Sequence, residues 1–126
     1  MGTNSFHFWD EGNINFELSQ TLDVSKLESY GSGKYGCSFD FQGNDGTNLD
    51  IYAFITVTYK DGTTQTFKGN TVEMQGWQKW QRTSVTGAQI DLSNVASVKV
   101  GIHVYAEATG AGPWGNIDNA QFYFED

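Results

Sequence analysis

The sequence has one cysteine and one proline in 126 residues, and it has no long apolar run. A lone Cys37 excludes an intrachain disulfide, and its alternation with Phe39 and Phe41 predicts a small buried core residue. No apolar stretch approaches the ~18 residues of a transmembrane helix, and no signal peptide is visible. Residues 1–3 are interpreted as an expression remnant, so secretion is an expectation that rests on the role of the domain rather than on a leader segment.

Basic residues are also scarce. Lys and Arg total 7 against 15 Asp and Glu, which gives a formal net charge of −8. This charge repels a phosphate backbone and an anionic membrane, so neither nucleic acid nor a membrane is an expected partner. Acidic polysaccharides are disfavoured for the same reason, and a neutral ligand is the natural match.

Glycine and aromatic residues, by contrast, are abundant, with 15 Gly, 4 Trp, 6 Tyr and 9 Phe. Together with many Thr, Asn and Ser, they favour strands joined by tight turns. The length fits one domain, which we place at residues 4–126 and expect to be monomeric.

Period-two alternation and turn residues predict an all-β, antiparallel β-sandwich of the jelly-roll kind. The Asp61-Gly62 pair gives the strongest hairpin signal, and residues 22–27 allow one helical turn. Val98, Val100, Ile102 and Val104 form one inward face. The expected strands are Asn4–Trp9, Ile14–Leu22, Tyr35–Gly43, Asp50–Lys60, Thr63–Lys68, Trp77–Thr86, Ser97–Ala106 and Asn116–Phe124.

No catalytic motif emerges from the sequence. A glycosidase needs two carboxylates in set positions, one with a raised pKa, and nothing selects a pair among the acidic residues. There is no Gly-x-Ser-x-Gly elbow, and His7 and His103 lack metal-type spacing. We therefore expect a protein that is not an enzyme. The acidic candidates are Asp10, Glu11, Asp40, Glu107 and Asp118.

Two tryptophans are expected on the surface. Trp114 is flanked by Gly112, Pro113 and Gly115, which predicts a loop position suited to a ligand. Trp9 ends a short strand, and it points outward if Phe6 and Phe8 point inward. Exposed aromatic rings stack on the C–H faces of sugars.

Polar side chains near these tryptophans could bond to sugar hydroxyls. Asn116 and Gln42 lie at predicted strand ends, and His7 shares the outward face with Trp9. Ordinary turn bonding to the backbone is an equally good explanation for Asn116 and Gln42.

Trp77 and Trp80 are three residues apart, so they face opposite sides if both lie in one strand. We expect Trp80 inside and Trp77 exposed at the strand entrance, as a further ligand candidate. Asp118, which follows the glycine-rich loop, could supply a carboxylate to Ca²⁺.

Five segments in order resemble carbohydrate-binding modules of family 61, which are galactose-binding-like β-sandwiches attached to endo-β-1,4-galactanases and related plant-cell-wall enzymes. The most specific are Ser19-Gln20-Thr21 and Trp114-Gly115-Asn116-Ile117-Asp118. The segments are Phe6–Trp9, Phe16–Leu22, Tyr35–Gly43, Gly76–Trp80 and Gly112–Asn119.

The resemblance implies a β-1,4-galactan ligand, an attached catalytic domain and a secreted parent enzyme. It also implies ligand contacts at Trp9, Trp114 and Asn116 and a structural Ca²⁺ near Asp118. Residues 23–34 and 59–71 depart from the shorter family pattern, so β-mannan, xyloglucan or mixed-linkage glucan are alternative ligands. A small glycan-cleaving enzyme and a protein-contact sandwich are the rival functions.

Overall fold

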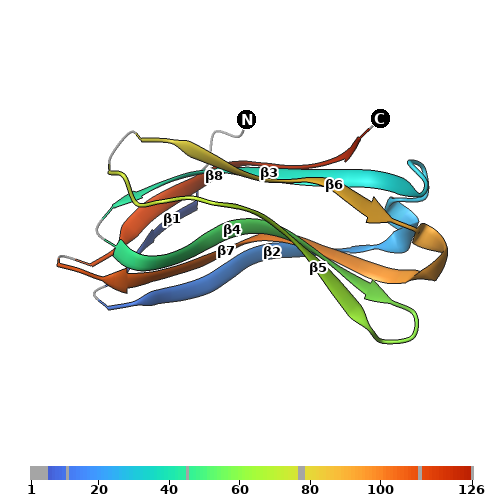
Figure 1. Cartoon of the computed structure of the whole chain (residues 1–126), viewed down its shortest axis with the longest axis horizontal. Coiled ribbons are helices and arrows are strands. Elements are labelled where there is room, and N and C mark those ends of the chain that lie inside the picture. Colours follow the sequence, from blue (N-terminus) through green and yellow to red (C-terminus); the bar gives the residue numbers. More distant parts are fainter. Residues whose placement is uncertain (1–5, 11, 45, 77–78, 111, 126) are drawn as a thin grey trace.

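The computed structural model describes residues 6–10, 12–44, 46–76, 79–110 and 112–125. Two four-stranded antiparallel sheets pack face to face (Figure 1), with strand orders β1-β8-β3-β6 and β2-β7-β4-β5. This order is that of a jelly roll, so the predicted fold class is confirmed. The strands are β1 (Phe6–Trp9), β2 (Ile14–Asp23), β3 (Gly33–Asn44), β4 (Gly46–Tyr59), β5 (Thr64–Thr71), β6 (Gln81–Ile90), β7 (Val95–Ala108) and β8 (Trp114–Glu125).

The core lies between the two sheets and follows the alternation of the central strands. On β7, Val98, Ile102 and Val104 are fully buried and Val100 is nearly so. The predicted inward face is therefore confirmed. Burial of such apolar faces is the main contribution to the stability of the sandwich.

Cys37 is a core residue, as expected, with no exposed surface. It lies on β3 and its Sγ donates a hydrogen bond to the carbonyl oxygen of Phe54 at 3.7 Å. Burial raises the pKa of the thiol to about 11, so the thiol stays protonated at neutral pH.

The turns at one end of the sandwich match their sequence signals. The β4–β5 hairpin is closed by a hydrogen bond from the Tyr59 N–H to the Thr63 carbonyl at 2.8 Å. Gly62 there has a φ of 91°, which suits glycine. The short helical turn is a 3₁₀ helix, η1 (Val24–Lys26), and a second one is η2 (Leu92–Asn94).

Several strand boundaries differ from those predicted, and β4, for example, begins at Gly46 rather than Asp50. The sequence placed a strand at Trp77–Thr86, whereas β6 begins at Gln81, and Lys79 and Trp80 lie before it in irregular backbone. Residues 77 and 78 lie outside the described residues. Trp80 therefore lies just outside the regular strand.

Several of the connections between strands lie together with β1 at one end of the molecule. In Figure 1 the β3–β4, β5–β6 and β7–β8 connections and β1 lie together at the left, and the 3₁₀ helices lie at the right. Among the described residues, no helix is long and apolar enough to cross a membrane.

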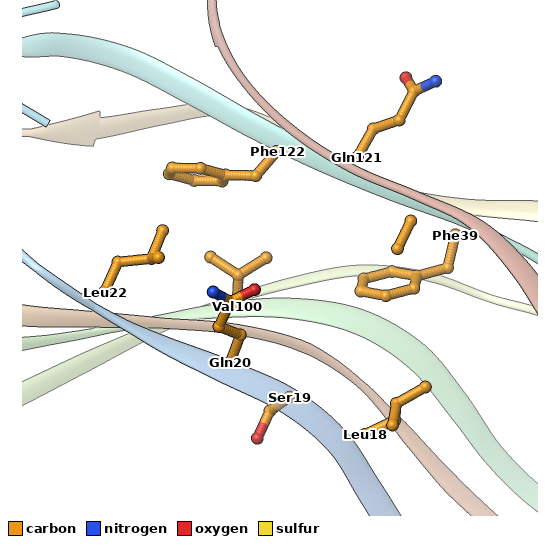
Figure 2. Close-up of a pocket in the computed structure, with 9 residues that line it drawn as sticks. Leu18, Ser19, Gln20, Leu22, Phe39, Val100, Gln121 and Phe122 are labelled. Carbon is orange, nitrogen blue, oxygen red and sulfur yellow. The ribbon is translucent and has the colours of Figure 1, made fainter. Parts of the chain in front are cut away.

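An apolar cavity of about 310 Å³ opens at the side of the sandwich, between β2 and β8 (Figure 2). Leu18 and Leu22 of β2 face Phe39 of β3 and Phe122 of β8 across it. Among the described residues, the β1–β8 ladder runs from Phe6 and Ile117 to Trp9 and Trp114. The cavity is lined mainly by hydrocarbon, and none of its described lining residues is a tryptophan.

Candidate functional site

Trp9 and Trp114 are cross-strand partners. They lie opposite each other in the β1–β8 register, although 105 residues separate them in the sequence. Trp9 is 55% exposed and Trp114 is half-buried. Trp114 is the first residue of β8 and not a loop residue as predicted. Directly opposed residues of an antiparallel pair have neighbouring side chains, so two indole rings share one surface.

The outward direction of this pair follows from what lies beneath it. Phe8 is buried and packs edge-on against Phe16 and stacked against Phe41. Because neighbouring residues of a strand face opposite sides, Trp9 and His7 point away from the core. Gly115, opposite Phe8, leaves room for its ring.

The loop before Trp114 is tied to β1. Pro113 is fully buried, and its carbonyl oxygen accepts a hydrogen bond from the Asp10 N–H at 3.3 Å. Gly112 takes a φ of 99° in this loop. The buried proline and the hydrogen bond to Asp10 hold together the strand ends that carry Trp9 and Trp114.

A polar row runs beside the tryptophan pair. His7 pairs with Asn116, and Asn116 pairs with Gln42 on its other side. His7 Nδ1 and Asn116 Oδ1 are 3.0 Å apart and share a hydrogen bond, which leaves the Asn116 amide nitrogen as a donor for other groups. Gln42 is only 4% exposed, so little of its side chain is open to a ligand.

Trp80 is exposed, contrary to prediction. The sequence placed it in the core, but 46% of it is accessible. Its predicted counterpart Trp77 lies outside the described residues. The error lies in the choice of the inward face: Trp80 is three residues before buried Thr83, and residues an odd number apart in a strand face opposite sides.

An ion pair occupies the next row of the same face. Arg82 Nε donates to Asp40 Oδ1 at 2.8 Å, and Asn119 Nδ2 donates to Asp40 Oδ2 at 3.1 Å. Hydrogen bonding from Arg82, aided by Asn119, lowers the pKa of Asp40. Asp40 pairs across the sheet with Asp118.

Asp118 is the position that the family resemblance matches to calcium. Its Oδ1 accepts a hydrogen bond from the Asn119 N–H at 2.7 Å. Among the described residues, no three His, Cys, Asp or Glu side chains gather to hold a metal ion. Calcium takes roughly six to eight oxygen ligands, so these side chains alone do not fit it, and calcium binding stays a prediction.

The chain matches known proteins in structure but not in sequence. No protein-family profile matches the chain, and no curated protein sequence matches it. A solved structure of TmCBM61 in complex with β-1,4-galactotriose superposes with a TM-score of 0.67 and 23% identity. The match covers 99% of this chain and 73% of that one. The fold is that of a carbohydrate-binding module of the family-61 type.

The fold also matches part of a viral protein. A chain of infectious bursal disease virus, Gx strain, matches with a TM-score of 0.53 and 19% identity, covering 95% of this chain and 29% of that chain. Identities this low establish the shared fold alone. Function has to be argued from the site residues.

Proposed function

We propose that this domain is a non-catalytic carbohydrate-binding module. The observation that carries the proposal is the cross-strand pair of Trp9 and Trp114 on the outer face of a rigid sheet. Indole rings offer large flat apolar faces at low entropic cost. Asn116, held by His7, lies one row away and supplies amide donors for sugar hydroxyls.

We propose a neutral plant-cell-wall polysaccharide as the ligand, with β-1,4-galactan the first choice. Two observations support this: the net charge of −8 disfavours acidic polymers, and TmCBM61 was solved with β-1,4-galactotriose. β-Glucan, xyloglucan and β-mannan are the alternatives. The ligand would stack on an open surface, and its binding would cost conformational entropy. We therefore expect an affinity of about the micromolar range or weaker.

Two of the acidic candidates, Asp40 and Glu107, are poorly suited to act as a general acid. A general acid in a glycosidase needs a raised pKa. Asp40 and Glu107 move the other way, because Arg82 donates to the first and Tyr105 to the second. Glu11, another acidic candidate, lies outside the described residues.

The proposal extends to the surroundings of the module. We propose that it acts as a secreted monomer that targets an attached glycoside hydrolase to the plant cell wall, with Asp118 as the residue that would contribute to any calcium site. These parts rest on the family resemblance.

Affinity gel electrophoresis tests the ligand directly. The panel contains β-1,4-galactan, galactomannan, xyloglucan, mixed-linkage glucan and cellulose. We expect retardation by galactan. Retardation by another member would keep the binding role and change the ligand, whereas no retardation together with a concentration-dependent dimer would favour the protein-contact function.

The residue assignment needs variants. We expect Trp114→Ala to abolish most binding without unfolding the domain, since the ring is half-buried at a strand end. Trp9→Ala is expected to act in the same direction. Galactan binding that stays unchanged in a folded Trp114→Ala variant would remove this assignment.

A further inference from the structure

Trp80 lies on the same outer face as the Trp9–Trp114 pair. On β6, Arg82 reaches outward to Asp40, and Thr83 is buried and donates to the Asn70 carbonyl. The Gln81 side chain is turned to the backbone of Glu73. Trp80 immediately precedes β6, and from its 46% exposure and the outward direction of Arg82 we infer that its ring lies on the side of Arg82.

The register places Trp80 at the end of the polar row. The β3–β6 ladder ends where Gln81 pairs with Phe41, so Trp80, one residue before Gln81, lies near the end of the row that contains Gln42. Gln42 pairs with Asn116, and Asn116 pairs with His7. The row therefore starts at β1, crosses β8 and β3, and ends near Trp80, just before β6.

The floor between the two edges is polar and covered. Gln42 is only 4% exposed although it belongs to the outer row, so its neighbours close over it. Asn116 beside it is half-buried and has a hydrogen-bonded side chain. The partly exposed Asn116 can therefore bond a hydroxyl in the middle of a ligand while the two ends of the ligand stack on the aromatic edges.

The separation of the edges sets the size of the ligand. Neighbouring strands lie about 4.8 Å apart, so the distance from β1 to the line of β6 is about 14 Å. This exceeds the width of a single sugar ring. An oligosaccharide lying across the strands spans both edges, whereas a monosaccharide reaches only one.

The perpendicular direction, along the strands, is less suitable. The next row carries Asp40 and Arg82, which already satisfy each other at 2.8 Å, and Asn119 also donates to Asp40. A ligand lying that way would compete with a formed ion pair.

We propose that Trp80 is a second stacking position for the same polysaccharide, which crosses the strands from β1 toward β6. The inference rests on the proposed carbohydrate binding and adds a residue, a direction and a minimum ligand length to it. The site would therefore recognise the interior of a polymer and not only a chain end.

Isothermal titration calorimetry with galactose and the β-1,4-linked galactobiose, galactotriose and galactotetraose tests this. For the unmodified protein, affinity is expected to rise with length until both edges are spanned. Trp80→Ala is expected to keep the affinity for the shorter sugars and bind the longer ones roughly tenfold more weakly, a typical loss for one stacked ring. Trp114→Ala is expected to lose affinity for the sugars of every length.

The control is Tyr30→Ala. Tyr30 is 59% exposed and stacks on Phe124, away from the tryptophans, so its removal should leave every affinity unchanged. Equal affinities of Trp80→Ala and the unmodified protein at all lengths would overturn the second position. An equal loss at all lengths, with an unchanged melting temperature, would overturn the crossing direction. Failure of the unmodified protein to bind any of the sugars or the galactan polymer would count against the proposed function itself.

Discussion

At the scale of single residues, Gly115 is the position on which the site depends most directly. A Cβ at this position would come within 2.4 Å of the Gln42 carbonyl oxygen and 2.7 Å of Phe8 Cζ. Gly115 stands between Trp114 and Asn116, and Phe8 stands between His7 and Trp9. The missing side chain therefore allows β1 to lie close to β8.

We expect Gly115→Ala to destabilise the fold by about 1–3 kcal/mol, the usual cost of overpacking. Galactan binding should fall as well, because the displaced Phe8 belongs to the strand that carries Trp9. Thermal melts and affinity electrophoresis measure the two effects. Gly12→Ala is a matched control, since a Cβ there has nothing within 4 Å. Normal stability of Gly115→Ala would contradict the close approach.

The Asp40–Arg82 pair predicts a pH dependence of stability. The pKa of Asp40 is lowered in the folded state by the Arg82 hydrogen bond. Its contribution is therefore complete above the unfolded value of about 4 and is lost as pH falls through the lower folded value. Arg82 is 55% exposed, so the contribution is small.

Arg82→Gln should lower stability slightly at neutral pH, and its curve should meet that of the unmodified protein as the pH falls below about 4. Urea denaturation at several pH values measures this. Lys99→Gln, which removes the Lys99–Glu17 pair on the other sheet, tests whether any lost ion pair has the same effect. Parallel pH curves for Arg82→Gln and the unmodified protein would show that Asp40 does not depend on Arg82.

At the scale of elements, the two ends of the sandwich have separate roles. The β4–β5 hairpin and the 3₁₀ helices lie at the end away from β1 and Trp114 (Figure 1). Changes in this hairpin should therefore affect stability and not binding.

Gly62→Ala tests the separation. Gly62 has a φ of 91°, which an alanine adopts only with strain, and we expect a loss of about 1 kcal/mol in the free energy of unfolding. The affinity for galactan at a temperature well below the melting point should stay the same. A weaker affinity would show that the hairpin end contributes to the ligand surface.

The sequence predicted most of these elements because strand periodicity is a local property. Eight strands, the Asp61-Gly62 hairpin and the inward face of β7 were all predicted correctly. The direction of Trp9 followed from Phe8 by alternation alone. Local patterns carry this information since neighbouring side chains of a strand take opposite sides.

The candidate site was harder to predict, because it depends on which residues of distant strands pair with each other. Nothing in the sequence pairs Trp9 with Trp114, or Gln42 with Asn116, since these contacts join distant strands. Trp80 was misplaced because the spacing of Trp77 and Trp80 puts them on opposite faces but does not say which face is inward. Its position three residues before buried Thr83, a partner of the Ala53 N–H, was the signal available in retrospect.

At the scale of the whole molecule, the balance of charge gives a test of the ligand class. A net charge of −8 repels polyanions, and this repulsion weakens with salt. Binding to a neutral galactan should be nearly independent of salt between low and physiological ionic strength.

Calcium binding would change the stability of the whole molecule. A bound ion stabilises a folded protein by an amount that grows with its concentration relative to Kd. If the family resemblance extends to calcium, the melting temperature rises in millimolar Ca²⁺ and falls in EDTA, and Asp118→Ala removes the difference. An identical melting temperature in Ca²⁺ and EDTA would eliminate a structural calcium ion.

The buried thiol of Cys37 allows the opening of the folded protein to be measured chemically. Cys37 lies on β3, the strand that also carries Gln42, and no part of it reaches solvent. A thiol reagent can modify the native chain only during rare openings of that sheet, at a rate that tracks the free energy of opening. A sugar that binds the closed sheet slows modification by the factor 1 + [L]/Kd. The rate of thiol modification would therefore report glycan binding in an unlabelled, unmutated protein.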